Sequence, residues 1–345
     1  MTTVKFGGAD PLPGRILVVG GQGAVGTTVT ATLDGWFPGR AVPAGRRAGV
    51  RVDVTDIDGF RRVADDLGDV TAVVLCVEPP DSGFARACLE RGVHLVDIGA
   101  TRHLLDGVTA LDAVASASGA TAVLSVGVAP GLTNLLARRA HDAVGGARRL
   151  DLTVLLGSGE RHGGDAVRWT VEGLAAPVTG RPARFALPGY GTRTAHPFPF
   201  SDQHTLRGTL GVPDVTTRLC LDSRPTTAAL FALRRAGLLR VARHPGPRRA
   251  LTRSFGLLHP GGDGFAVRAD AWNGNRHAAF ALTGRAQSRV TGLVAAYVTR
   301  AVLTGTPPPG VHHIERLPAL AGLPEELAAH GVTLHHPLHD GPAGR

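Results

Sequence analysis

The chain has 345 residues, 43% of them hydrophobic, which is enough to bury the cores of about two domains. Its three cysteines are scattered, so we expect a reducing compartment, the cytoplasm, and no disulfide framework. The formal net charge is +9. However, the arginines are dispersed and lack interleaved aromatic side chains, and we interpret the basic stretch 240–253 as a solvated surface with no nucleic-acid partner. No apolar run is long enough to span a membrane, and no metal-ligand motif occurs.

Short apolar runs alternate with helical stretches in the first part of the chain. Residues 15–19 form an apolar run that leads into a glycine cluster, and a helical stretch from Ala24 to Leu33 follows. Strands that alternate with helices predict a parallel, doubly wound α/β sheet. The other predicted strands are 72–77, 94–98 and 122–126, and the predicted helices between them are 59–67, 83–91 and 108–118.

The regular alternation ends near residue 145. Strand-like runs then follow without regular helices, which predicts a second, mixed α+β domain. Helical periodicity returns at 288–304, and we expect this helix to rejoin the first domain. The predicted organisation is a Rossmann domain of residues 1–135 completed by 286–345, with 136–285 as a substrate and dimerisation domain. The strand-like runs of the second domain are 150–156, 215–221 and 264–268.

A glycine motif lies directly between the first predicted strand and the first predicted helix. The sequence Gly21-Gln22-Gly23-Ala24-Val25-Gly26 has the G-x-G-x-x-G spacing. In a dinucleotide-binding turn Gly21 permits the tight bend, Gly23 lets the backbone approach a pyrophosphate, and Gly26 allows close helix–strand packing. The alternative is a glycine turn that binds nothing.

The segment about 20 residues further on distinguishes NAD from NADP. An acidic residue there binds the ribose hydroxyls of NAD, whereas this chain has Arg46 and Arg47 after Gly45. Guanidinium groups suit a 2′-phosphate, so we expect the cofactor to be NADP. Asp53 and Val54, which we place at the end of the next short strand, are expected beside the adenine.

The ends of the later strands predict the nicotinamide region, because ligands bind beyond the carboxyl ends of the strands in this fold. We expect Cys76, Val77 and Glu78 there, together with Pro130 and Gly131. Cys76 is expected to be a small apolar strand residue and not a nucleophile.

Asp97 and His103 are the candidate catalytic residues. His103 is a candidate proton donor because an imidazole titrates near neutral pH; the alternative is a surface histidine. Asp97 either orients the substrate or the nicotinamide ribose, or caps its loop. In the second domain we expect Arg168 to hold a carboxylate, Trp169 to stack on a substrate and His204 to contact it, although a core tryptophan beside an exposed arginine is the common alternative.

Three further segments, 92–98, 127–134 and 309–315, together with the glycine motif and Arg46, resemble the saccharopine dehydrogenase-like NADP-binding family. This resemblance implies a Rossmann domain, an inserted substrate domain and hydride transfer between NADP(H) and a carbon bound to nitrogen or oxygen. The family also includes relatives proposed as enoyl reductases. The chain has Ala129 where the saccharopine and carboxynorspermidine enzymes carry aspartate, so it lacks that carboxylate as a partner for an ammonium group.

The sequence therefore predicts an NADPH-dependent oxidoreductase that transfers hydride to a C=N, C=O or activated C=C bond of a small metabolite. A homodimer is the expected assembly. The alternative is a non-catalytic NADP(H)-binding sensor or scaffold whose second domain binds a protein.

Overall fold

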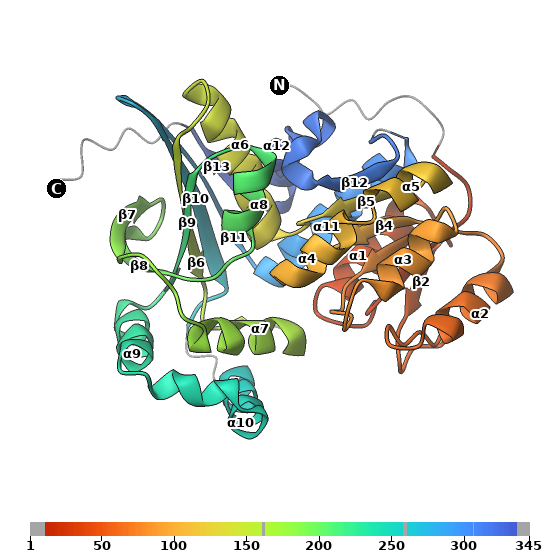
Figure 1. The fold of residues 1–345 in the computed structure, drawn as a ribbon, viewed down its shortest axis with the longest axis horizontal. Coiled ribbons are helices and arrows are strands. Elements are labelled where there is room, and N and C mark those ends of the chain that lie inside the picture. Colours follow the sequence, from red (N-terminus) through yellow and green to blue (C-terminus); the bar gives the residue numbers. More distant parts are fainter. Residues whose placement is uncertain (1–10, 161–162, 258–260, 306, 337–345) are drawn as a thin grey trace. The chain divides into compact units, whose positions relative to one another are not determined.

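The computed structural model describes residues 11–160, 163–257, 261–305 and 307–336, of which 255–257 are described in their backbone only. Contacts divide the chain into two units (Figure 1). The first unit joins the chain up to Gly131 with Ser288–Glu326, and the second joins Leu132–Gln287 with the chain from Leu327 onward.

The first unit contains a six-stranded parallel sheet in the order β12-β5-β4-β3-β1-β2. The chain builds outward from β1 in both directions, which is the doubly wound Rossmann arrangement with its switch point beside β1. The strands are β1 (Arg15–Val19), β2 (Ala41–Ala44), β3 (Val70–Leu75), β4 (His94–Asp97), β5 (Thr121–Leu124) and β12 (Gly310–His313). The helices are α1 (Gly26–Trp36), α2 (Ile57–Leu67), α3 (Gly83–Glu90), α4 (Arg102–Thr109), α5 (Asp112–Ser118), α11 (Gln287–Leu303) and α12 (Leu323–Glu326).

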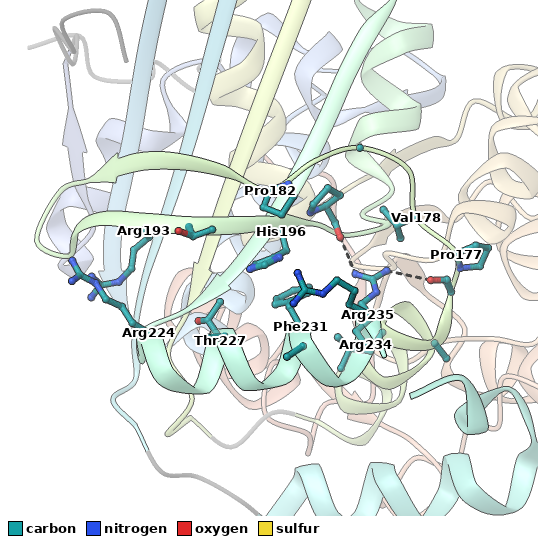
Figure 2. Close-up of a pocket in the computed structure, with 18 of the residues that line it drawn as sticks. Pro177, Val178, Pro182, Arg193, His196, Arg224, Thr227, Phe231, Arg234 and Arg235 are labelled. Carbon is teal, nitrogen blue, oxygen red and sulfur yellow. Dashed lines mark hydrogen bonds between the residues drawn. The ribbon is translucent and has the colours of Figure 1, made fainter. Parts of the chain in front are cut away.

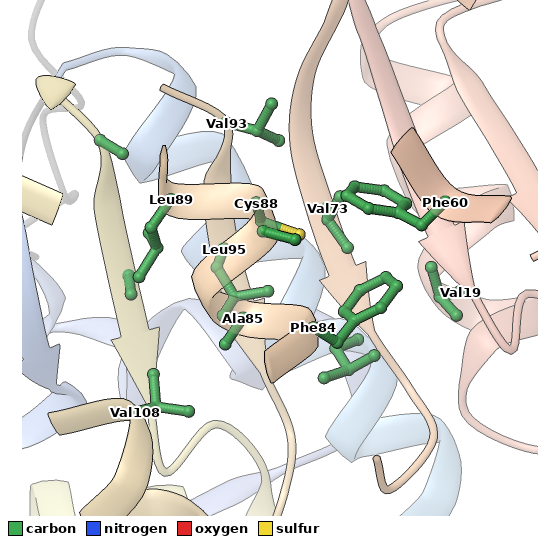
Figure 3. Close-up of a cluster of buried hydrophobic side chains, with 14 of the residues drawn as sticks. Val19, Phe60, Val73, Phe84, Ala85, Cys88, Leu89, Val93, Leu95 and Val108 are labelled. Carbon is green, nitrogen blue, oxygen red and sulfur yellow. The ribbon is translucent and has the colours of Figure 1, made fainter. Parts of the chain in front are cut away.

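One face of this sheet is covered by the apolar sides of α2 and α3 (Figure 3). The rings of Phe60 and Phe84 lie with centroids 4.6 Å apart, and both side chains are fully buried against strand residues such as Val19 and Val73. Since residues 16–19 of β1 are buried on both faces, the strand is a continuous apolar run without polar alternation.

Helices α1 and α11 pack closely against each other because Gly292 lies at their contact. A Cβ atom at Gly292 would lie 2.8 Å from the Val25 carbonyl oxygen, so a larger residue would force the helices apart. At the other end of the contact the ring of Trp36 meets the ring of Tyr297 edge-on at 4.9 Å. The predicted return of this helix to the first domain agrees with these contacts.

The second unit contains a seven-stranded mixed sheet in the order β13-β11-β10-β6-β9-β8-β7. Neighbours are antiparallel except β6 and β9, which are parallel. The strands are β6 (Arg149–Leu156), β7 (Ala183–Leu187), β8 (Gly191–Pro197), β9 (Asp214–Leu221), β10 (Gly264–Asn273), β11 (Arg276–Arg285) and β13 (Thr333–His335). The helices are α6 (Thr133–Ala143), α7 (Gly164–Ala175), α8 (Asp202–Thr209), α9 (Arg224–Arg235) and α10 (Pro245–Leu257).

Two features of the fold differ from the sequence prediction. The segment 286–345 was predicted to complete the first domain throughout, but β13 pairs with β11 in the sheet of the second unit. Asp53 and Val54 were predicted at the end of a strand, whereas the second strand ends earlier, at Ala44, and residues 51–54 form a loop.

Replacing Phe84 with alanine tests the core of the first unit. Removing this fully buried ring leaves a cavity under α3, and the variant should lose about 3–5 kcal/mol of unfolding free energy. Amide hydrogen exchange of peptides from β1 and β3 measures the effect within this unit. Leu12→Ala is the control because Leu12 is 38% exposed, and equal exchange rates in the two variants would contradict the described core.

Candidate functional site

The turn after β1 depends on glycine because its backbone segments almost touch. A Cβ atom at Gly26 would collide with the carbonyl oxygen of Gly20 and lie 2.7 Å from the Cα of Gly21. A Cβ atom at Gly21 would lie 2.8 Å from the carbonyl oxygen of Val18. The first turn of α1 is therefore held directly against the end of the strand.

The start of α1 presents backbone donors without internal acceptors. Within the part of the chain that the structure describes, the N–H groups of Ala24, Val25 and Gly26 have no hydrogen-bond acceptor. Val25, at the N-cap, offers no side-chain cap, and Gln22, Gly23 and Ala24 are exposed. Free N–H groups at the positive end of a helix dipole, on an open glycine turn, form a site that fits a phosphate or pyrophosphate group.

The arginine segment is tied to this turn by its backbone. The N–H groups of Gly20 and Gly21 both donate to the carbonyl oxygen of Ala44, at 2.8 and 3.3 Å. Arg46 and Arg47 follow two and three residues later, and both side chains are exposed. No described carboxylate forms an ion pair with either guanidinium group. The pair is thus available to an anionic group that lies beside the glycine turn.

Asp53 and Val54 lie in the loop that follows β2. The loop folds back because Gly45 donates to the Val50 carbonyl oxygen and accepts from the Val52 N–H group. Hydrogen bonds from Thr55, and more weakly the charge of Arg46, lower the pKa of Asp53. Asp53 is therefore near Arg46, and the contact of Asp53 and Val54 with an adenine stays a prediction.

Cys76, Val77 and Glu78 follow β3 and border the glycine turn. A Cβ atom at Gly20 would lie 2.7 Å from a methyl group of Val77 and 3.2 Å from the Cys76 carbonyl oxygen. Glu78 accepts a hydrogen bond from Thr101 at 2.7 Å. Burial raises the pKa of the Cys76 thiol to about 12, so at neutral pH it is an uncharged thiol, which is unsuited to nucleophilic attack.

Asp97 is the last residue of β4, and its carboxyl group is buried. It lies opposite Leu75 in the sheet, and it accepts a hydrogen bond from the Gly99 N–H at 2.7 Å. Burial raises the pKa of Asp97 to about 6. The Gly99 hydrogen bond acts in the opposite direction, and the charge of Glu78 adds to the effect of burial. This carboxyl group can hold or release a proton near neutral pH, while it also caps its loop.

His103 and Asp97 differ in their surroundings. His103 lies in the first turn of α4, and its side chain is exposed. An exposed position agrees with the surface-histidine alternative, and its role as a proton donor stays a prediction.

Pro130 and Gly131 lie in an irregular segment after β5 and are both buried. The peptide bond between Ala129 and Pro130 is cis, and the carbonyl oxygen of Pro130 lies 3.1 Å from where a Cβ atom of Gly127 would be. The segment is therefore compact, and cofactor contact by Pro130 and Gly131 stays a prediction.

A buried polar cluster at the ends of β5 and β12 was missed by the sequence analysis. The Nδ1 atom of His313 lies 2.9 Å from the hydroxyl of Ser125, and its Nε2 atom lies 3.4 Å from the hydroxyl of Thr109. Burial lowers the pKa of His313, which favours the neutral imidazole in this cluster. The strand β12, which ends at His313, pairs with β5.

The three predicted substrate residues lie on helices of the second unit, and their contact with a substrate stays a prediction. Trp169 of α7 packs against the rings of Phe198 and Phe200, at 5.3 and 5.1 Å, so its indole belongs to an aromatic cluster. Arg168 pairs with Asp165 at 3.2 Å on the same helix, and His204 lies on α8. The arrangement agrees with a packed tryptophan beside a surface arginine.

A large pocket of the second unit was not predicted (Figure 2). It encloses about 990 Å³ between β8, α9 and the segment that follows α7. Arg240 and Arg243, which were predicted to form a solvated basic surface, are exposed, which confirms that prediction, and they also line this pocket. Arg168, Trp169 and His204 are not among its lining residues.

Comparisons with known proteins give similarity to solved structures only. No family model matches the chain, and no curated protein matches it. A C. glutamicum DAP dehydrogenase in complex with DAP is 16% identical, over 92% of this chain and 98% of that one, with a TM-score of 0.47. An engineered D-amino acid dehydrogenase bound to NADP+ is 15% identical, over 92% and 98%, with a TM-score of 0.49. At these values the likeness concerns the fold alone. None of the described helices is long and apolar enough to cross a lipid bilayer.

Replacing Gly26 with alanine should abolish dinucleotide binding, because the new methyl group collides with the Gly20 carbonyl and displaces the helix start. Gly35→Ala is the matched control, since it lies in the same helix with nothing within 4 Å of the added Cβ atom. The control should bind normally and be more stable by about 0.5–1 kcal/mol. Calorimetric titration with NADPH measures both variants, and equal affinities would contradict the assignment of the turn.

The pKa of Asp97 predicts how the Asp97→Asn variant compares with the unmodified chain. The folded carboxyl holds its proton up to about pH 6, whereas an unfolded aspartate loses it near about pH 3.9. The unmodified chain should therefore lose stability relative to the variant as pH rises between these values, by up to about 3 kcal/mol. Chemical denaturation across this range measures the difference, and a difference independent of pH would show that Asp97 ionises normally.

Proposed function

We propose that this chain is an NADPH-dependent oxidoreductase that delivers hydride to a C=N, C=O or activated C=C bond of a small molecule. One observation carries the proposal: the glycine turn with its free N–H groups and the exposed arginine pair are joined through the Ala44 carbonyl oxygen. This link supports the proposal because the turn fits a pyrophosphate and the guanidinium groups that follow Ala44 suit a 2′-phosphate.

Each part of the proposed cofactor site has its own task. The N–H groups of Ala24, Val25 and Gly26 hold the pyrophosphate, and Arg46 and Arg47 hold the 2′-phosphate. Asp53 and Val54 border the adenine, while Val77 and Glu78 line the path from the glycine turn toward Asp97. When bound, NADPH supplies a hydride from C4 of its nicotinamide.

Reduction of a ketone or imine also consumes a proton, and Asp97 is the group best suited to deliver one. Its raised pKa keeps a fraction of the carboxyl protonated near neutral pH, and general acids work best when their pKa is near the operating pH. His103, exposed in the first turn of α4, is the second candidate.

The finer assignments are also part of this proposal. The chain is placed in the saccharopine dehydrogenase-like NADP-binding family on the strength of its glycine motif, Arg46 and the segments 92–98, 127–134 and 309–315. A cytoplasmic homodimer is proposed with it.

A turnover screen tests whether the chain is an enzyme. The purified chain is mixed with NADPH and with imines, keto acids and enoyl compounds, and the loss of nicotinamide absorbance is followed. Turnover of one class, lowered at least about 100-fold in Asp97→Asn, supports the proposal with Asp97 as proton donor. NADPH binding without turnover of any class would instead favour the sensor or scaffold.

The double variant Arg46→Ala/Arg47→Ala tests the 2′-phosphate site. Loss of two charge-assisted contacts should weaken NADPH binding by about 10- to 1,000-fold and leave NADH binding within about twofold. Arg61→Ala is the control, because Arg61 is an exposed arginine of the same unit that pairs with Asp58 on α2. Equal losses for NADPH and NADH would contradict the role of the arginine pair.

A further inference from the structure

The pocket of the second unit has an unusual concentration of positive charge. Its walls come from β8, α9, the segment after α7 and the 3₁₀ helix Leu238–Arg243, all within one unit. Seven arginines line it, and no aspartate or glutamate does. The seven are Arg184, Arg193, Arg224, Arg234, Arg235, Arg240 and Arg243.

None of these seven guanidinium groups is neutralised by a described carboxylate. No ion pair joins any of them to an aspartate or glutamate of the described chain. The two nearby carboxylates are engaged elsewhere. Glu172 pairs with Arg248 at 2.9 Å, and Asp222 accepts hydrogen bonds from Ser158, Ser223 and Gly262.

Several of the arginines are held in place by neutral acceptors. Arg234 donates to the carbonyl oxygens of Pro197, Gly173 and Ala176 at 2.8 to 3.2 Å. Arg193 donates to the carbonyl oxygen of Asp222 at 3.3 Å, while its buried Nε atom has no partner among the described residues. Backbone carbonyls fix the positions of these side chains and leave their charge uncompensated, so the pocket is preorganised for an anion.

Four of the arginines lie at two ends of the pocket. Figure 2 shows Arg193 and Arg224 at one end and Arg234 and Arg235 at the other, with His196 and Phe231 between them. The His196 and Phe231 rings are stacked, with centroids 4.1 Å apart and planes 6° from parallel. Burial and the charges of Arg234 and Arg235 lower the pKa of His196, which leaves a neutral ring pair between two basic ends.

We propose that this pocket binds a small organic molecule that carries carboxylate or phosphate groups at both ends of an apolar or planar body. Guanidinium groups bind carboxylate and phosphate with paired hydrogen bonds, and the volume suits a small-molecule ligand. Because the arginines line a cavity, a small molecule fits better than a nucleic-acid backbone. The inference rests on the second unit alone and does not depend on NADPH binding.

Calorimetric titration of the full chain in about 0.15 M salt, which screens weak surface attraction, tests the proposal. The carboxylate probe is 4,4′-biphenyldicarboxylate, with biphenyl-4-carboxylate as its single-acid counterpart. The phosphate probe is biphenyl-4,4′-diyl bisphosphate, with biphenyl-4-yl phosphate as its single-acid counterpart. Either the dicarboxylate or the bisphosphate should bind at least about tenfold more tightly than its single-acid counterpart. The probe that binds shows whether the pocket takes carboxylate or phosphate groups.

Three variants locate the binding. Arg224→Gln and Arg235→Gln each remove one charge, at opposite ends of the pocket, and each should weaken the doubly acidic probe by about tenfold or more. Arg249→Gln is the matched control, since Arg249 is an exposed arginine of α10 that does not line the pocket, and its affinity should stay within about twofold of the unmodified chain. Circular dichroism confirms that all three variants fold.

Several results would overturn the proposal. They are no binding of any probe below about 1 mM, equal affinities for doubly and singly acidic probes, and equal losses in all three variants. Duplex DNA that binds more tightly than the probes and is weakened by the same two variants would assign the arginines to a macromolecule. If NADPH displaces the probe, and does so equally well in the Arg46→Ala/Arg47→Ala variant, the pocket belongs to the dinucleotide. If NADPH does not bind to the chain at all, the proposed cofactor site fails while the probe results still decide the pocket proposal.

Discussion

The close approach of α1 to the end of β1 is the constraint on which the proposed cofactor site depends. Because Gly26 has no Cβ atom, the first turn of the helix can rest on the Gly20 carbonyl oxygen, and N–H groups of this turn have no acceptor within the described chain. The same turn donates two hydrogen bonds to the Ala44 carbonyl oxygen. These bonds fix the end of β2 next to the turn, and Arg46 follows two residues later. One steric requirement thus positions both the pyrophosphate-binding turn and the arginine pair.

The two units use charge in different ways. In the first unit the groups proposed for chemistry are few, and a buried carboxyl group, Asp97, has its pKa raised by its surroundings. In the second unit buried charges of the sheet are paired, as Arg218 is with Asp151 at 2.8 Å, whereas the arginines of the pocket are not. Five of the seven pocket arginines are exposed, so the observation behind the proposed ligand is that they converge in one pocket that no aspartate or glutamate lines.

Sequence patterns predicted the first unit well because its strands are buried on both faces and its turns depend on glycine. The predicted strand at residues 15–19 matches β1. The edge strand β2 was missed because it is short and contains Pro43, and β12 was missed because two histidines follow a proline-rich run and become a strand only beside β5. The pocket was missed for the same reason: its arginines are spread from Arg184 to Arg243 and converge only through tertiary packing.

The central claim is that the glycine turn and the arginine pair together hold a 2′-phosphorylated dinucleotide. Calorimetric titration of the unmodified chain with NADPH and with NADH, side by side under identical conditions, tests it most directly. NADPH should bind at least about tenfold more tightly than NADH, since only NADPH carries the phosphate that Arg46 and Arg47 would contact. Equal affinities would contradict the role of the arginines, and no binding of either dinucleotide would contradict the role of the turn itself.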